Sequence, residues 1–270
     1  MNRTMDLETI RLNAHSALTD ALRSIAIQGV AERSGKAYDV AALMYHRLAL
    51  CELLAELRSD RFQVLLCKSA LVRLVAMRLT VAGRTFHPLT MCASKNFSFV
   101  DAITAGQLDL AVTLARLMPD RHDPQWEYED DFLLHRFMHK RLLHLHAREE
   151  HDLHPLLARW EQVVGGEHAP YLEACQMLLK HDADGFHDAL IAVIEERGRQ
   201  FKEKGAYPEE ARRTDGALFM NGFALLRLAE LDGLATQREY PNIPRFARLP
   251  VSKLPLSPDA WKTPTEALPS

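Results

Sequence analysis

The chain has 270 residues, of which 47% are hydrophobic, and its formal net charge is −3. This length and composition supply enough apolar surface for a large core, so we expect the chain to fold without a partner. Proteins that bind nucleic acid carry a basic excess or a basic face, and the lack of one here argues against nucleic acid as a direct ligand.

The start of the chain and its most apolar stretch indicate a cytoplasmic protein. Residues 1–6 run directly into an amphipathic pattern and lack the apolar core of a signal peptide. The most apolar window, residues 62–82, contains Lys68, Arg73 and Arg78. Each of these charges would cost about 3 kcal/mol at the centre of a bilayer. We therefore expect no membrane segment and interpret the window as a central core helix.

Cysteine usage fits the same compartment. The four cysteines lie far apart and form no C-x-x-C pair, so nothing in their spacing indicates a zinc or redox site. We expect all of them to be small buried hydrophobic residues. They are Cys51, Cys67, Cys92 and Cys175.

Three helical segments follow one another in the first third of the chain. Apolar residues at steps of three and four predict a helix over about 6–29, a second over 38–57 and a third over 59–83. Their short connections favour an antiparallel array. A segment with glycine and proline at 83–88 interrupts the pattern, so we expect an N-terminal helical bundle of residues 1–90.

Pairs of short helices dominate the prediction for residues 91–245, which we expect to pack on the N-terminal bundle as one globule. The predicted pairs are 97–105 with 108–118 and 171–180 with 186–199, and a last helix is predicted from about Asp215 to Leu231. Similar residues at 105–111 and 184–189 indicate an imperfect repeat of such a hairpin.

The sequence predicts an all-α fold, an antiparallel helical bundle or helical-hairpin array with a C-terminal tail. No run of β-branched residues alternates with polar ones, and no Asn-Gly or Asp-Gly turn joins two such runs. Beyond Tyr240, repeated prolines forbid a continued helix. Residues 246–270 are therefore predicted to form an extended, proline-rich tail.

Motifs for nucleophilic or phosphate chemistry are missing. The Gly-x-Ser-x-Gly elbow of hydrolases does not occur. The pair Gly165-Gly166 is followed by Glu167-His168 instead of the Lys-Ser or Lys-Thr of a phosphate-binding loop. We expect a protein that is not an enzyme and needs no cofactor.

Histidines are the one possible exception, because several of the 13 in the chain lie close together in the sequence. On a helix, Asp131, His135 and His139 share one face, a spacing that suits zinc or iron. The face also carries Leu142, and no His-Glu-x-x-His signature is present. Structural histidines are the first interpretation, and a metal-dependent helical enzyme using these three residues is the alternative.

An acidic, aromatic segment spans Asp120 to Phe132. Its carboxylates at 129–131 suit the first turn of a helix, where they meet the positive end of the helix dipole. Its carboxylates and large aromatic residues also suit docking to a basic protein, with an aromatic anchor and electrostatic steering. The candidate binding residues are Asp120, Asp123, Trp126, Glu127, Tyr128, Glu129, Asp130 and Asp131.

Five short segments in the second part of the chain form an ordered pattern. They are Asp101–Gly106, Ala111–Leu117, Glu127–Phe132, Met177–Phe186 and Tyr240–Pro244. Together they resemble the immunity-49 family of bacterial polymorphic-toxin immunity proteins, over roughly Phe97 to Pro244. The resemblance does not cover residues 1–90. It implies a protein that binds a cognate toxin tightly and covers the toxin's active site.

The resemblance and the charge pattern lead to one expected partner. In the cytoplasm the toxin would be a nuclease or a nucleotide-directed enzyme, whose active-site surface is basic because it holds phosphate. An acidic surface on this chain would complement it. We expect an immunity protein that occludes this toxin. The alternatives are the metal-dependent enzyme and a helical-repeat scaffold for an unrelated protein partner.

Overall fold

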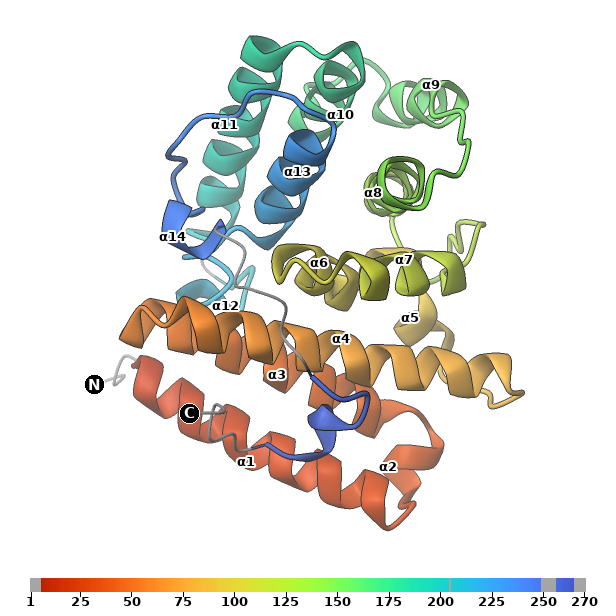
Figure 1. The fold of residues 1–270 in the computed structure, drawn as a ribbon, viewed down its shortest axis with the longest axis vertical. Helices are drawn as coiled ribbons and strands as arrows, with labels where there is room; N and C mark the ends of the chain where they lie inside the picture. The colour runs from red at the N-terminus through yellow and green to blue at the C-terminus, as the bar shows by residue number, and fades with distance from the viewer. Residues whose placement is uncertain (1–5, 204, 249–255, 265–270) are drawn as a thin grey trace.

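The computed structural model describes residues 6–203, 205–248 and 256–264. These residues form α-helices joined by loops (Figure 1), and the β-type pairing among them is an isolated bridge between Tyr240 and Ile243. The all-α class predicted from the sequence is therefore confirmed. None of the described helices combines the length and the apolar character that a membrane span needs.

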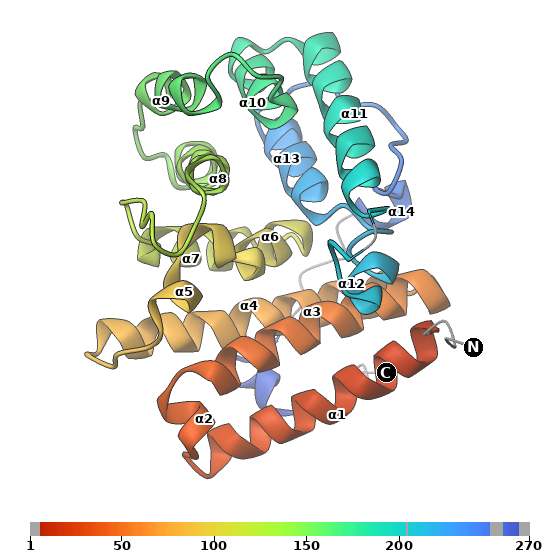
Figure 2. The same ribbon diagram turned by 180° about the vertical axis from the view of Figure 1, so that it is seen from behind.

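Three long helices form the lower layer of the molecule in Figure 1. They are α1 (Leu7–Ala26), α3 (Lys36–Glu56) and α4 (Ser59–Val81), with the single turn α2 (Val30–Arg33) after the first. Figure 2 shows α3 between α1 and α4, and it packs against both. Asp6 caps α1 by accepting a hydrogen bond from the Thr9 N–H at 2.7 Å. These helices confirm the prediction for the first third of the chain.

Two short helices lie across α4 and form the middle of the molecule (Figure 1). They are α6 (Phe97–Thr104) and α7 (Leu108–Leu117), and they follow the short helix α5 (Pro88–Met91) and the 3₁₀ turn η1 (Ala93–Lys95). Gly106 in the turn between α6 and α7 has φ 69°, a conformation that glycine adopts without strain. Both predicted helices are confirmed.

Most of the remaining helices form the upper part of the molecule, and two short ones lie lower, near the level of α6 and α4 (Figure 1). They are α8 (Glu129–Ala147), α9 (His154–Val164), α10 (Pro170–Lys180), α11 (Ala183–Gln200), α12 (Glu209–Arg213), α13 (Met220–Leu231) and α14 (Arg245–Arg248). α10 packs on α11, as predicted, and α13 packs on α6 and α8. Residues 105–111 include the turn before α7, whereas 184–189 lie inside α11. The two segments of the predicted repeat therefore occupy different positions.

The predicted start of the last long helix, about Asp215, is wrong, because the helix begins more than one turn later in the chain. α13 begins at Met220, because residues around Gly216 form a tight turn. The Gly216 N–H bonds the Ala211 carbonyl at 2.8 Å. A Cβ at Gly216 would lie 2.3 Å from the Arg212 carbonyl oxygen, so only glycine fits here. This turn also directs Asp215 toward α3.

The described residues bury two apolar cores. The larger one extends from α3 and α4, with Phe62 at its base, through α6 to α8, α10, α11 and α13. The smaller one lies between α1, α3 and α4 and includes Trp261. α4 contributes to both cores, so the larger core crosses the predicted boundary near residue 90.

The C-terminal residues are less extended than the prolines predict. Arg245–Arg248 form α14, and Ala260–Lys262 form the 3₁₀ turn η2. Trp261 in η2 is only 3% exposed and belongs to the smaller core. The parts of the predicted tail at 249–255 and 265–270 lie outside the described residues.

We predict that Phe62→Ala lowers the free energy of unfolding by about 4 kcal/mol, the usual cost of removing a buried phenyl ring. Phe62 is fully buried and packs near Phe223, with ring centroids 6.1 Å apart. Urea unfolding followed by circular dichroism measures the change. Phe246→Ala is the control, because Phe246 is exposed and its loss should cost less than about 1 kcal/mol. Equal effects of the two substitutions would contradict the larger core described above.

Candidate functional site

The structure divides the acidic, aromatic segment into anchored and exposed residues, and Glu127 and Trp126 are anchored. The Glu127 side chain is buried and accepts a hydrogen bond from the Ser94 N–H of η1 at 2.9 Å. The Trp126 ring packs edge-on against His87, with centroids 4.8 Å apart. Both residues hold the loop before α8 against the α5–η1 region, with the Glu127 side chain buried and Trp126 partly exposed.

Three more of the predicted binding residues have partners within the chain. Asp120 forms an ion pair with Arg136 of α8. Asp123 accepts a hydrogen bond from a backbone N–H in its own loop, that of Gln125, at 3.1 Å. Glu129 pairs with Arg159 of α9 through two hydrogen bonds of 2.7 and 2.9 Å, which lower the pKa of Glu129. These carboxylates shape the loop and join α8 to α9.

Tyr128, Asp130 and Asp131 are exposed to solvent, as is Asp120. The Tyr128 side chain is directed to solvent, with 79% of the residue exposed. Asp130 accepts a hydrogen bond from the Asp131 N–H at 2.9 Å, within the first turn of α8, where the helix dipole favours negative charge. The pKa of Asp131 is raised, because the surrounding protein removes solvent from its carboxylate and Asp130 carries a like charge. The sequence-based prediction that these acids begin a helix is confirmed.

Asp130 and Asp131 line one side of a cleft of about 560 Å³ between the start of α8 and helices α9, α10 and α11. Two further carboxylates, Glu167 and Glu196, also line it. We call this feature the acidic cleft. Apolar and aromatic groups complete its wall, namely Leu134, Trp160, Val163, Val164, Tyr171 and Leu172.

No lysine or arginine is found among the described residues that line the acidic cleft. His168 is the one basic side chain there, and it lies 3.2 Å from Glu173. Four carboxylates around an apolar wall suit an arginine or lysine of another molecule. The aliphatic stem of such a residue packs on the wall while its charged end meets the carboxylates.

The sequence did not indicate Glu167, Tyr171 and Glu196. Glu167 lies between α9 and α10, Tyr171 on α10 and Glu196 on α11. All three are too far along the chain from the start of α8 for a local sequence pattern to connect them with it. Glu167 follows the pair Gly165-Gly166, whose positive φ angles turn the chain after α9. That glycine pair is the one local signal of a turn in this wall of the cleft.

The histidines of the alternative metal site are buried. Burial, with Lys95 nearby, lowers the pKa of His135 to about 4, and burial holds that of His139 well below its usual value. Both rings are therefore neutral, and His139 packs edge-on against Phe99 with centroids 4.3 Å apart. Asp131 is exposed instead. In the part of the chain that the structure describes, no three His, Cys, Asp or Glu side chains are arranged to hold a metal.

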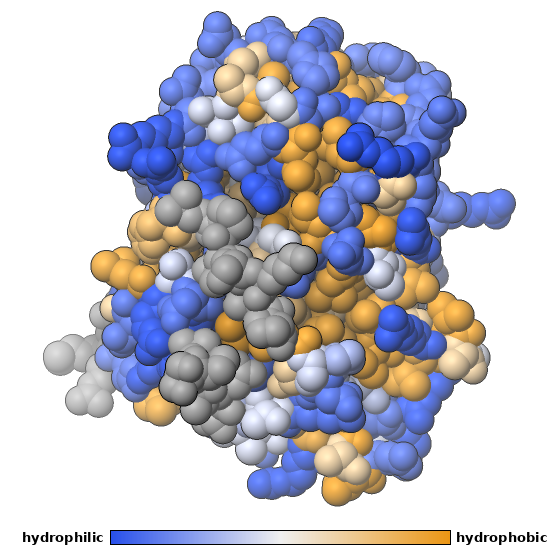
Figure 3. Space-filling view, viewed as in Figure 1, coloured by the Kyte–Doolittle hydropathy of each residue, from blue (hydrophilic) through white to orange (hydrophobic). Residues whose placement is uncertain are grey.

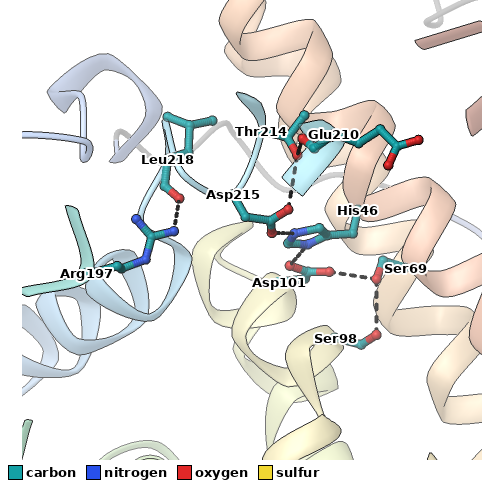
Figure 4. A network of polar contacts seen from close by, with 9 residues as sticks. All are labelled: His46, Ser69, Ser98, Asp101, Arg197, Glu210, Thr214, Asp215 and Leu218. Carbon is teal, nitrogen blue, oxygen red and sulfur yellow. Dashed lines mark hydrogen bonds and ion pairs between the residues drawn. The ribbon is translucent and has the colours of Figure 1, made fainter. Parts of the chain in front are cut away.

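A second polar cluster, absent from the sequence-based candidates, lies where α3, α4, α6 and the turn before α13 meet (Figure 4). His46 Nδ1 lies 2.8 Å from a carboxylate oxygen of Asp101, and its Nε2 lies 3.1 Å from one of Asp215. Ser69 donates a hydrogen bond of 2.6 Å to Asp101 and lies 3.1 Å from Ser98. We call this set the His46 cluster.

The His46 cluster pairs a charged histidine with two carboxylates and does not activate a nucleophile. Burial alone would lower the pKa of His46, but the charges and hydrogen bonds of Asp101 and Asp215 raise it to about 10. The ring is thus an imidazolium that donates from both nitrogens. Ser69 donates to the carboxylate of Asp101, and the charged imidazole of His46 cannot act as the base that takes the serine proton in a catalytic triad. This geometry joins helices and does not form a catalytic triad.

Burial makes Cys51, Cys92 and Cys175 poor nucleophiles. All four cysteines are buried with free thiols, as predicted. Burial raises the pKa of Cys51 and of Cys92 to about 11 and that of Cys175 well above the ordinary value. At neutral pH these thiols stay protonated, and a thiol is far less reactive than a thiolate.

Comparison of the chain with protein-family models, with curated proteins and with solved structures finds no match. The acidic cleft and the chemistry of its lining are therefore the basis for a functional assignment.

We predict that His46→Ala lowers the free energy of unfolding by about 3 to 5 kcal/mol. The substitution leaves Asp101, which is 0% exposed, without its cation, and an uncompensated buried charge carries a cost of this size. Urea unfolding measures it. His15→Ala serves as the control, because His15 is exposed on α1 and its loss should change stability by less than about 0.5 kcal/mol. A small effect of His46→Ala would mean that the cluster does not hold the layers together.

We also predict a pH dependence that belongs to His46. Its pKa in the folded protein, about 10, lies above the usual 6.5. The stabilisation is therefore complete below about pH 6.5 and is lost as the pH rises through 10. The free energy of unfolding, measured from pH 6.5 to 10, should fall more steeply for the native chain than for His46→Ala. Parallel curves for the two proteins would show that His46 is not charged in the fold.

Proposed function

We propose that this chain is a cytoplasmic immunity protein that binds a cognate toxin and covers the toxin's active site, with the acidic cleft as the central contact. The observation that carries the proposal is the cleft itself, in which four carboxylates and no lysine or arginine line an apolar wall. The ordered segments that resemble the immunity-49 family support the same function.

Electrostatics favour a basic partner at this site. Asp130 and Asp131 lie next to each other, and their mutual repulsion contributes to the raised pKa of Asp131. A cation entering the cleft removes that repulsion and gains interaction with both carboxylates. A toxin that acts on nucleic acid or nucleotides carries lysine or arginine in its active site, because it must hold phosphate. Capture of such a residue in the cleft would remove it from the phosphate site of the toxin.

The wall of the cleft and Tyr128 supply the apolar part of such an interface. Trp160 and Leu134 are almost fully buried, and the partly exposed Val163, Val164 and Tyr171 supply the apolar contact surface in front of them. Tyr128 projects beside the cleft and offers an exposed aromatic side chain of the type that dominates binding energy in many interfaces. The proposed interface is thus Tyr128, Asp130, Asp131, Glu167 and Glu196, in place of the anchored Trp126 and Glu127.

The test uses the product of a toxin gene that lies beside the gene for this chain. The double substitution Asp130→Asn and Asp131→Asn should weaken toxin binding by at least about 30-fold, since loss of two close charge contacts commonly costs 2 kcal/mol or more. It should leave the melting temperature unchanged within a few degrees. Titration calorimetry measures the affinity, and rescue of growth in cells that express the toxin measures neutralisation.

Two matched variants separate binding from folding. Asp188→Asn removes an exposed carboxylate on α11 away from the cleft and should leave the affinity unchanged. Glu127→Ala removes the acceptor of the Ser94 N–H and should lower stability by about 1 to 2 kcal/mol, with affinity preserved in the folded fraction. If Glu127→Ala abolishes toxin binding and the double variant still binds, the interface lies outside the cleft. No complex with the native chain would refute the function.

A further inference from the structure

One ion pair lies at the rim of the acidic cleft, and neither of its members lines the cleft. Arg159 of α9 donates two hydrogen bonds, of 2.7 and 2.9 Å, to Glu129 in the first turn of α8. Glu129 directly precedes the cleft carboxylates Asp130 and Asp131, and Arg159 directly precedes Trp160 of the cleft wall. The pair therefore adjoins the carboxylates on α8 and the wall on α9.

Arg159 is the one arginine or lysine of α9. Val163, one helical turn later, lines the cleft, so Arg159 lies on the side of α9 that carries the wall. Its side chain is 53% exposed, and Figure 3 shows mostly hydrophilic residues at the surface around α9. An exposed arginine changes rotamer at little cost, and neighbouring residues have Cα atoms only about 3.8 Å apart. The carboxylate after Glu129 is thus within reach of the guanidinium.

The cleft carboxylates do not share the charge of Arg159. Burial and the like charge of Asp130 raise the pKa of Asp131, and Lys95 acts against them, whereas Arg159 does not contribute. The hydrogen bonds from Arg159 do lower the pKa of Glu129. Glu129 therefore takes up the positive charge at the rim and leaves the cleft itself negative.

We propose that Glu129 keeps the acidic cleft open to a basic partner by holding Arg159, the chain's own cation at the rim, away from Asp130 and Asp131. The inference rests on the proposed function, because it assigns Glu129 a positioning role for the same site. Without the Glu129 carboxylate, the guanidinium turns to the next carboxylates along the chain and competes there with the cation of the partner. Glu129 thus sets the affinity without touching the partner.

The first experiment measures toxin affinity by titration calorimetry on variants of the full chain. Glu129→Gln frees Arg159 and should weaken binding by about 5-fold, the size expected when an exposed ion pair opposes binding. Combining it with Arg159→Gln should restore the native affinity, because no competing cation is left. Arg159→Gln alone should bind at least as tightly as the native chain.

The chain offers a matched control beyond the other end of α8. Arg116 of α7 donates two hydrogen bonds, of 2.8 and 2.6 Å, to Glu149. Glu149→Gln therefore breaks an ion pair of the same kind, far from the cleft, and should leave toxin affinity unchanged. Circular dichroism melts verify that each variant is folded.

The second experiment needs no toxin. It reads the pKa of Asp131 from the pH titration of its carboxyl carbon by NMR. The pKa should be lower in Glu129→Gln than in the double variant, because both lack the Glu129 carboxylate and only the first keeps a cation that can reach Asp131.

Equal pKa values of Asp131 in these two variants would overturn the inference, whether or not a toxin binds. Native affinity in Glu129→Gln would overturn it as well. So would equal weakening by Arg159→Gln alone, because the pair would then only brace α8 against α9. The absence of any complex with the native chain would refute the proposed function instead, and the NMR comparison would still decide whether Glu129 holds Arg159 away from the cleft.

Discussion

The imidazolium of His46 is the interaction on which the arrangement of the layers depends. His46 lies on α3 in the lower layer, whereas Asp101 comes from α6 and Asp215 from the turn before α13. Asp101 is completely buried, and a buried carboxylate is tolerated only when a cation and hydrogen bonds compensate it. The protein satisfies that requirement at the point where its lower, middle and upper parts meet, so the cluster also determines how the α8–α13 region sits on α4.

The upper and the lower helices make contacts of opposite character. The upper helices enclose the acidic cleft, whose carboxylates lie at the start of α8 and on the facing α9–α10 and α11 segments. The lower helices bury the Trp261 side chain and hold the carbonyls of Trp261 and Thr263 through the Tyr45 hydroxyl and the Lys68 ammonium. Carboxylates at a cleft act on charge over a distance, whereas the Trp261 contact depends on close packing.

Local patterns in the sequence were sufficient for the helices and for the position of the acidic turn. Helical periodicity marks α1, α3, α4 and α6 to within a few residues, and the acids at 129–131 mark the first turn of α8. The same patterns carry no information about partners far along the chain. Glu127 is buried because Ser94, 33 positions earlier, donates to it, and His46 meets carboxylates 55 and 169 positions away. Trp261 follows several prolines, and nothing nearby indicates its burial.

Hydrogen exchange on the complex with the proposed toxin partner locates the contact without any substitution. An interface at the acidic cleft would slow the exchange of backbone amides at the first turn of α8 and in residues 165–171, since these segments line the cleft. Protection confined to α1 and α4, or to no segment at all, would contradict it.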